Sequence, residues 1–379
     1  MRKFEVSCMK KLNKTTQSNF ITYAIVILAF IICQSLISAG SMTRSLKGQL
    51  VPICVYIVMA VSLNLTVGIS GELSLGHAGF MSVGAFAGIV FSAWAQAALG
   101  IENTIVRLLL CMVIGGIFAG IAGVLIGIPV LRLRGDYLAI VTLAFGEIIR
   151  NVFNCLYISL IPGSVQYVAD AANPEVFTKT QVLDRLNIAF NTTPNADWNI
   201  IVNGPAGATG VTKIATFTVG FALILFTLVV VLNLINSRSG RAIMAIRDNR
   251  IAAESMGINV TKYKMMAFVT SAVLAGMAGA LYGLNYSTVT ASKFKFDTSI
   301  TVLVFVVLGG IGNIRGSIIA ATLLTVLPEM LRAFSDYRML IYAIVLIVVM
   351  LATNSPQIRQ LVERIIPKRR KAGKEGEAA

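Results

Sequence analysis

The stretch IATFTVGFALILFTLVVVLNLI, residues 214–235, contains no charged side chain and decides the class of fold. About 20 consecutive apolar residues form a helix long enough to cross the hydrocarbon core of a bilayer. Comparable apolar runs recur from Phe20 to Thr353, and the chain has a mean hydropathy of +0.80. Only 13% of its 379 residues are charged, about half the share typical of soluble domains. The sequence therefore predicts an all-α polytopic membrane protein.

The apolar runs predict about ten transmembrane helices within a membrane domain over 20–353. The predicted spans cover residues 20–39, 50–70, 73–98, 104–130, 137–161, 214–235, 265–290, 299–312, 316–333 and 338–353. Lysine and arginine accumulate on the cytoplasmic side of membrane proteins. The basic tails 1–19 and 354–379 and the basic loop 236–264 are therefore expected in the cytoplasm. With both termini on one side, the number of spans is even, which favours ten spans over nine.

This topology places the segment 162–213 on the outer face, where its Pro, Asn, Thr and Asp content fits either a long loop or a small ordered lobe. Most of the net charge of +15 then lies on the cytoplasmic face. There it would meet anionic membrane lipid, so it does not indicate a nucleic-acid partner. Five widely spaced cysteines and a single histidine, His77, predict neither a disulfide framework nor a metal site.

Glycines spaced four residues apart recur within the predicted spans. The pairs are Gly84 and Gly88, Gly116 and Gly120, Gly123 and Gly127, and Gly279 and Gly283. Small residues let the backbones of membrane helices approach one another closely. We therefore predict tight helix packing at these positions rather than a direct role in transport.

The cytoplasmic stretch SGRAIMAIRDNRIAAESMGINV, residues 239–260, is the strongest functional signal. It predicts a short helix between two spans, which Asp248 caps and Gly257 ends. Apolar side chains recur three or four positions apart on this helix, at Ala245, Ile246, Ala252, Ala253 and Met256. Such a face packs on a partner protein or, as the alternative, on a surface of anionic lipid.

The segment AAESMG, residues 252–257, resembles the cytoplasmic loop through which ABC-importer permeases dock on their ATPase subunits. The wider sequence, over about 50–335, resembles the LivM-type permeases of branched-chain amino acid ABC importers. Four further stretches carry this likeness: LNLTVGISGELSLGHAGF (63–80), LRLRGDYLAIVTLAFGE (131–147), KMMAFVTSAVLAGMAG (264–279) and SITVLVFVVLGGIGNIRG (299–316). Two features depart from the family pattern: the stretch 154–203 is longer than usual, and an acidic residue expected near Arg250 is absent.

The resemblance implies a permease subunit in the bacterial plasma (inner) membrane that takes part in ATP-driven import of leucine, isoleucine or valine. It also implies three kinds of partner: a second homologous, LivH-like permease, two ABC ATPase subunits, and an extracytoplasmic substrate-binding protein. The residues that it places in the ATPase-coupling loop are Arg241, Arg247, Asp248, Ala252, Ala253, Glu254 and Gly257. The sequence has no G-x-x-x-x-G-K-[ST] phosphate-binding loop, so ATP and Mg²⁺ are expected on the partner subunits. We expect no cofactor and no catalytic residue in this chain.

Two polar clusters are candidates for the translocation path. The first comprises Asn64, Thr66, Ser70, Glu72, Ser74, His77 and Ser82. Interspersed glycines predict a broken helix, which is tolerated at membrane depth where it lines a cavity or is buried in protein. Free amides at a helix N-terminus would suit the carboxylate of an amino acid. The alternative is that Glu72 and His77 lie at the cytoplasmic end of a span, in contact with water.

The second cluster lies near the middle of the predicted span 137–161 and comprises Glu147, Arg150, Asn151 and Asn154. A lone charge at that depth costs about 2.5–3.5 kcal/mol on insertion scales. Glu147 and Arg150 are three residues apart and can pair on one helix face. The polar stripe is expected to face the bundle interior, either as a structural ion pair or as part of the substrate path.

Two other functions fit parts of this pattern. A related permease could carry urea, short amides or another amino acid. A protein of a different class, an ion-coupled secondary carrier or channel, would use Glu147, Arg150 and His77 as an ion route. The source of energy separates the two classes, because a carrier works alone whereas a permease is inert without its ATPases. No nucleophile–base set in the sequence supports a membrane enzyme.

Overall fold

The computed structural model describes residues 22–39, 43–133, 135–161, 165–169, 177–181, 185–190 and 199–331, together with 340, 343–344 and 347. The tails 1–19 and 354–379, most of the last predicted span and parts of 162–213 lie outside the described residues. The chain forms two compact units, Met1–Thr325 and Val326–Ala379. Helices α2 to α10 lie wholly within the first unit, which also holds the candidate sites.

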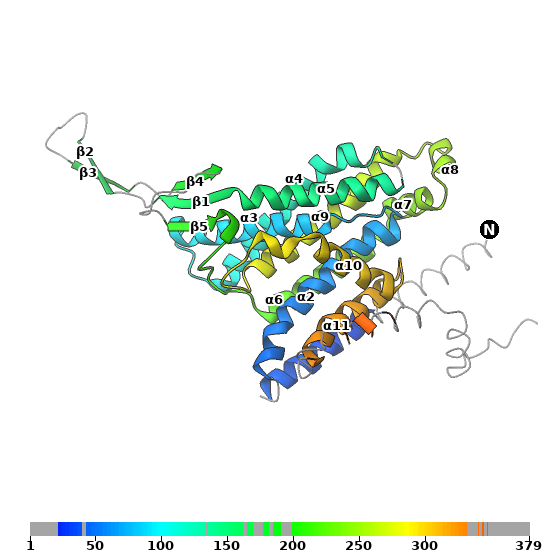
Figure 1. Ribbon diagram of the computed structural model, residues 1–379, viewed down its shortest axis with the longest axis horizontal. Helices are drawn as coiled ribbons and strands as arrows, with labels where there is room; N and C mark the ends of the chain where they lie inside the picture. The colour runs from blue at the N-terminus through cyan, green and yellow to red at the C-terminus, as the bar shows by residue number, and fades with distance from the viewer. Residues whose placement is uncertain are drawn as a thin grey trace, which may run out of the picture. The chain divides into compact units, whose positions relative to one another are not determined.

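The described part of the chain is mainly helical (Figure 1). Its α-helices are Thr22–Ser38, α2 (Arg44–Asn64), α3 (His77–Ala98), α4 (Thr104–Val130), α5 (Asp136–Asn154), α6 (Phe217–Asn236), α7 (Arg238–Asp248), α8 (Arg250–Ser255), α9 (Val260–Gly283), α10 (Phe296–Gly309) and α11 (Ile314–Met330). Among these residues, five segments are long and apolar enough to cross a membrane: Leu46–Ile69, His77–Ala98, Thr104–Val130, Phe217–Asn236 and Val260–Gly283. The predicted polytopic membrane class is confirmed at this level. The number of ten spans and the side on which the termini lie stay predictions.

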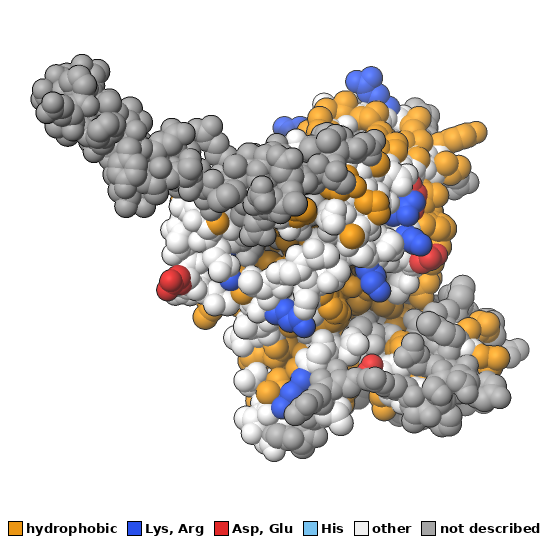
Figure 2. Space-filling model, turned by 60° about the vertical axis from the view of Figure 1, so that its left-hand side comes forward, with side chains coloured by type: hydrophobic (Ala, Val, Ile, Leu, Met, Phe, Trp, Pro, Cys, Tyr) orange, Lys and Arg blue, Asp and Glu red, His pale blue; other side chains and the backbone are white. Residues whose placement is uncertain are grey.

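The outward face of α4 accounts for part of the high apolar content. Ile105, Leu109, Val113 and Ile117 follow one another at four-residue intervals, and each side chain is about half exposed in the isolated chain. Figure 2 shows hydrophobic side chains reaching the surface of the described part of the molecule. In a bilayer such a stripe contacts lipid tails, which are as apolar as the side chains themselves.

Helix α9 lies at the centre of the bundle, because α2, α3 and α4 all pack against it. Glycines permit this close approach: a Cβ atom on Gly84 of α3 would lie 2.0 Å from the backbone oxygen of Gly276 in α9. A Cβ atom on Gly279 of α9 would lie 2.0 Å from the backbone oxygen of Met81. For every glycine of the four predicted pairs, an added Cβ atom would lie within 3.1 Å of an atom in a neighbouring helix. The predicted tight packing is therefore confirmed.

The segment after α5 forms two small antiparallel sheets, to which the described part of 162–213 contributes four strands. The strands are β1 (Leu156–Ile161), β2 (Val165–Ala169), β3 (Phe177–Gln181), β4 (Arg185–Phe190) and β5 (Asn199–Asn203). In the larger sheet β1 lies between β4 and β5, and Ile158 pairs with Ile188 and with Val202. Strands β2 and β3 form a separate hairpin. The predicted all-α architecture is wrong for this segment.

The predicted span 137–161 is wrong at its C-terminal end. Helix α5 ends at Asn154, and the apolar run LYISLI that follows is the central strand β1. A short apolar run does not distinguish a buried strand from a helix. The aromatic Tyr157 and the β-branched Ile158 favour the strand, because such side chains pack well on a pleated surface. The placement of this lobe on the outer face stays a prediction.

The predicted break between the spans 50–70 and 73–98 is confirmed. Helix α2 continues into a π-helical turn, η1 (Leu65–Ile69), and residues 70–76 are not helical. Gly71 has a φ of +75°, a backbone conformation that glycine adopts without strain. Residues 65–76 are called the break segment from this point on.

Candidate coupling and translocation site

The predicted coupling loop folds as two short helices rather than one, and an extended Asn249 separates α7 from α8. Asn249 Oδ1 accepts a hydrogen bond from the Ala252 amide at 3.0 Å, so Asn249 and not Asp248 caps α8. Asp248 instead pairs with Arg247, with 2.9 Å between Oδ1 and Nη2. The prediction that Gly257 ends the helix is confirmed by its φ of +79° just after α8.

One side of α8 is packed and another is exposed. Ala253 is buried in a small core with Ile246 of α7 and Val260 of α9. Ile251 and Met256, by contrast, are 79% and 81% exposed. Of the predicted apolar face, Ile246 and Ala253 therefore pack on the chain itself, whereas Met256 is left for an external contact. Large apolar side chains exposed on one short helix favour docking to a partner protein or to lipid.

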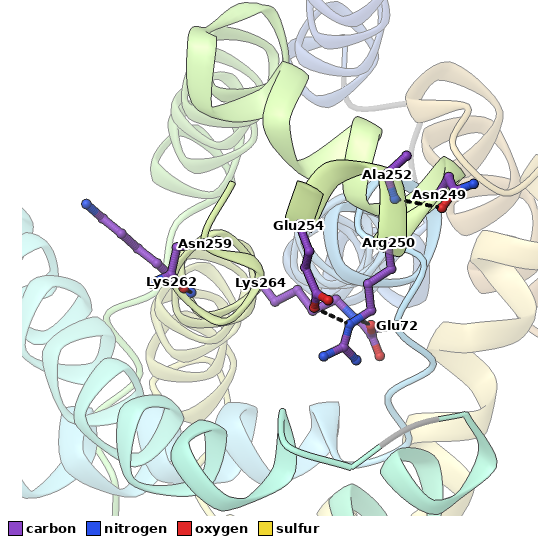
Figure 3. A network of polar contacts seen from close by, with 8 residues as sticks. All are labelled: Glu72, Asn249, Arg250, Ala252, Glu254, Asn259, Lys262 and Lys264. Atoms are coloured by element: carbon purple, nitrogen blue, oxygen red, sulfur yellow. Dashed lines mark hydrogen bonds and ion pairs between the residues drawn. The ribbon is translucent and has the colours of Figure 1, made fainter. Parts of the chain in front are cut away.

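Two ion pairs connect residues of this region (Figure 3). Arg250 Nε lies 2.9 Å from Glu254 Oε1, one turn further along α8. Lys264 near the start of α9 pairs with Glu72 of the break segment. The Lys264 and Glu72 side chains are only 13% and 12% exposed. The interpretation that Glu72 is solvated does not fit this burial, and a partner within the chain already holds its carboxylate.

Arg247 ties α7 to the break segment. Arg247 Nη1 donates a hydrogen bond to the backbone oxygen of Gly68 at 2.9 Å. A Cβ atom on Gly71 would lie 2.7 Å from Arg247 Cγ, so both this contact and the positive φ of Gly71 require glycine. A side chain of the coupling loop thus contacts the break segment directly, across 179 positions of sequence.

Asn64 links the end of α2 to the turn between α10 and α11. Its Oδ1 accepts a hydrogen bond from the Gly312 amide at 2.8 Å, and its Nδ2 donates to Ser317 Oγ at 2.9 Å. The side chain is fully buried. Gly68 packs on the same turn, because its Cβ would lie 2.4 Å from the Gly312 nitrogen. Since both ends of the amide are bonded, Asn64 is a structural link rather than a free lining group.

Several amides around the start of α3 are already bonded within the chain. The Ala78 amide donates to Ser299 Oγ at 3.0 Å, and the Gly79 amide donates to the backbone oxygen of Gly76 at 3.0 Å. Just before the helix, the Leu75 amide donates to the hydroxyl of Thr142 in α5 at 3.1 Å. These contacts leave fewer amides for a ligand, and the hypothesis that this helix N-terminus binds a substrate carboxylate stays a prediction.

His77 is buried and bonded within the protein, so the alternative in which it contacts water does not fit either. Its Nε2 lies 2.9 Å from Ser62 Oγ, and Ser62 Oγ donates to the backbone oxygen of Met59 at 3.0 Å. The buried hydroxyls of Ser70 and Ser74 have no partner among the described residues. The first cluster therefore combines bonded groups with two unpaired hydroxyls.

The predicted pair in α5 is confirmed, because Arg150 Nε lies 2.7 Å from Glu147 Oε2. Arg150 Nη2 also donates to Asn151 Oδ1 at 3.3 Å. The expectation that this stripe faces the bundle interior is wrong within this chain, since Asn151 is exposed and Asn154 only partly buried. Helix α5 lies at the edge of the bundle, and its Gly146 packs against the start of α3. The polar stripe is thereby left open to a second chain.

Sequence reasoning missed Arg107 and Gln96. Arg107 in α4 is 5% exposed, and its Nη1 donates to Gln96 Oε1 of α3 at 2.7 Å. The available signal was a single charge inside the predicted span 104–130, because ionisable residues within membrane helices are rare and tend to be functional. Within the described ranges, no group of three or more His, Cys, Asp or Glu side chains could hold a metal ion.

Comparison with known proteins gives a consistent assignment. The family model described as "Branched-chain amino acid transport system / permease component" matches residues 45–350. Over 300 residues the chain is 35% identical to the "High-affinity branched-chain amino acid transport system permease protein LivM" of Salmonella typhimurium and of Escherichia coli, covering 78% of this chain and 66% of each relative. It is 24% identical over 301 residues to the corresponding protein LivH of Salmonella typhimurium, covering 78% and 88% of the two chains.

The match to the LivM relatives thus spans just under two thirds of their own length. No solved structure matches the chain. The family match includes the break segment, the coupling loop and α5. This chain therefore belongs to the family of permease components of branched-chain amino acid transport systems.

Proposed function

We propose that this chain is a membrane-spanning subunit of an ATP-driven importer for branched-chain amino acids in the bacterial inner membrane. The LivM and LivH relatives are both named as permease proteins of a high-affinity transport system for these amino acids. Similarity to both relatives supports a second, LivH-like permease as partner. The exposed polar stripe of α5 around Arg150 and Asn151 is a surface that such a partner would cover.

The observation that carries the proposal is the exposed side of α8. Ile251 and Met256 point away from the chain, while Ala253 anchors the helix from its buried side. Full burial of one large apolar side chain stabilises an association by about 1.5–3 kcal/mol. An ATPase groove that received both side chains would thus gain a substantial part of its affinity from α8. Two ATPase subunits would bind ATP and Mg²⁺, and an extracytoplasmic binding protein would deliver the amino acid.

The contacts of Arg247 supply a route by which movement of the coupling loop would reach the bundle. Arg247 bonds Gly68, Gly68 packs on the turn that holds Gly312, and Asn64 bonds the same turn. Arg241 Nη1 holds α7 to the end of α6 through the backbone oxygen of Asn236, at 3.3 Å. When the ATPases close, displacement of α7 would therefore pull on the break segment and on the α10–α11 turn together.

The test is ATP-dependent uptake of L-leucine into proteoliposomes that hold the chain with its co-purified partners, together with the amount of ATPase retained. Ile251→Asp should abolish both, because a charge replaces an apolar contact. Leu99→Asp is the control for ATPase retention. It places the same charge on a side chain that is 52% exposed and directly follows the C-terminal end of α3, the end remote from the coupling loop. Retention of the ATPase by the Ile251 variant would overturn the docking role of α8.

The same preparation separates the alternatives. Uptake by the chain without ATPase subunits, driven by an ion gradient, would indicate a secondary carrier and overturn the proposal. Isoleucine and valine should compete with leucine, whereas urea and acetamide should not. Competition by urea or an amide would reassign the cargo and leave the permease role in place.

A further inference from the structure

A cavity of about 490 Å³ lies at the C-terminal end of α3. Its walls are the last turns of α3, strand β5 and the loop residues 209–212. Helix α3 begins at His77, next to the break segment that α7 contacts. Ser92, in the cavity wall, lies about 22 Å further along the helix axis at 1.5 Å per residue. The cavity is therefore at the end of α3 remote from the coupling loop.

A buried positive charge lies behind this cavity. Arg107 Nη1 donates to Oε1 of Gln96, which lines the cavity, whereas Arg107 Nε is buried without a hydrogen-bond partner among the described residues. In the described part of the chain, no carboxylate lies within 4.0 Å of the guanidinium. A guanidinium stays charged in proteins, and near the start of α4 the helix dipole disfavours it. Because a buried charge without a counter-ion is costly, this site lacks one negative charge.

The cavity wall offers hydrogen-bond donors next to this charge. The Ser92 side chain is 3% exposed, and its hydroxyl has no nitrogen or oxygen partner in the described ranges. The hydroxyl lies beside the thiol of Cys111. Because Arg107 occupies Gln96 Oε1, the NH₂ group of Gln96 is what remains for the cavity. Donors grouped beside a buried guanidinium suit a carboxylate, and the described lining residues include no acidic side chain that would repel one.

The rest of the wall is apolar. Ile89 of α3 and Ile200 and Ile201 of β5 line the same cavity. A short branched hydrocarbon chain would bury its surface against these side chains, which is favourable. A sugar or another polyol would instead place hydroxyl groups against isoleucine, and an unpaired polar group in such a contact is costly.

We propose that this cavity binds a small aliphatic carboxylate. The carboxylate is directed to Ser92, Gln96 and the charge of Arg107, and the aliphatic part faces the three isoleucines. The narrower assignment of this ligand as a branched-chain amino acid rests on the proposed function. The site then holds the cargo at the end of the chain remote from the ATPase-coupling loop.

The test is equilibrium dialysis of radiolabelled L-leucine against the full-length chain, purified in detergent with its permease and ATPase partners and without the extracytoplasmic binding protein, which would itself bind leucine. Arg107→Met should raise the Kd at least tenfold, because it removes the charge and keeps an apolar stem. Removing a buried charge that has no counter-ion relieves its desolvation cost, so the thermal midpoint should not fall. Lys47→Met, which removes an exposed positive charge from α2, is the control and should leave the Kd unchanged.

Ala93→Phe gives a second, independent variant, since it fills the cavity from α3 without altering Arg107 or Gln96 and should abolish binding. Among small probes, 3-methylbutanoate should compete with leucine, whereas 3-methylbutylamine should not. Leucine binding unchanged in both variants would overturn the site, and so would competition by the amine alone. If the complex fails to import leucine but still binds 3-methylbutanoate in a manner that requires Arg107, the proposed cargo fails and the site stands.

Discussion

Substitution of Gly84 by alanine tests the packing of the bundle directly. An alanine Cβ on α3 would lie 2.0 Å from the Gly276 oxygen and 2.5 Å from Gly276 Cα, and both are backbone atoms that cannot rotate away. Ordinary van der Waals contact begins at 3.4 Å, so the two helices would have to separate locally by about 1.4 Å. Overpacking of this kind typically costs about 1–3 kcal/mol, occasionally more.

Alanine also stabilises a helix by about 1 kcal/mol relative to glycine. A control glycine with free space around its Cβ position is therefore needed to separate this gain from the steric cost. Gly48 of α2 has no atom within 4 Å of its Cβ position, and Gly48→Ala should be neutral or stabilising. Gly120→Ala should fall in between, because its Cβ would meet only Val273 Cγ2, at 2.8 Å, and a valine methyl group can shift. We expect stability to decrease in the order Gly48→Ala, Gly120→Ala, Gly84→Ala.

The assay is the apparent thermal midpoint of the purified chain, followed by size-exclusion chromatography after heating. Domains of 150–250 residues lose about 2–4 °C for each kcal/mol. The Gly84 variant should therefore lie about 2–12 °C below the Gly48 variant, because the gain in helix propensity is common to both variants. Equal midpoints for these two variants would refute the backbone contact between α3 and α9, whatever the Gly120 variant does.

Three further outcomes are expected. Asn64→Leu should destabilise the chain by about 1–3 kcal/mol, because the partly buried Gly312 amide loses its acceptor, whereas the Ser317 hydroxyl keeps its hydrogen bond to the backbone oxygen of Asn313; an unchanged thermal midpoint would contradict this link. Lys264→Met should lower the yield of folded chain by leaving the Glu72 carboxylate buried and unpaired, and the double variant with Glu72→Gln should restore that yield. A cysteine in place of Asn151, with the native cysteines replaced, should react with a water-soluble thiol reagent in the isolated chain and be protected in the assembled transporter. Equal reaction rates in the two states would exclude a partner contact at that position.

Features that depend on neighbouring residues of one helix were predictable from the sequence. The charge-free run 214–235 predicts α6, and glycines such as Gly84 and Gly279 predict close helix contacts, because length and spacing alone decide both. The Glu147–Arg150 pair was predictable for the same reason, since residues three apart lie on one helix face.

Features that depend on distant partners were not predictable. Glu72 and Lys264 are 192 positions apart, so nothing local distinguishes a buried pair from a solvated carboxylate. The polar stripe of α5 was placed in the interior because a helix pattern shows that one face is polar, but not which neighbour that face meets. The capping role of Asn249 was not predictable, because Asp and Asn both cap helices well. The choice between the adjacent Asp248 and Asn249 depends on where α7 ends.

The independence of α8 has a consequence for the evolution of partner choice. Asn249 begins this helix and Gly257 ends it, so its start and stop signals are contained in nine consecutive positions, 249–257. Its exposed side chains, Ile251 and Met256, support no other part of the described chain. Substitutions at these two positions can therefore accumulate without cost to the bundle. Paralogous permeases in one cell could diverge in which ATPase they recruit while their membrane parts stay the same.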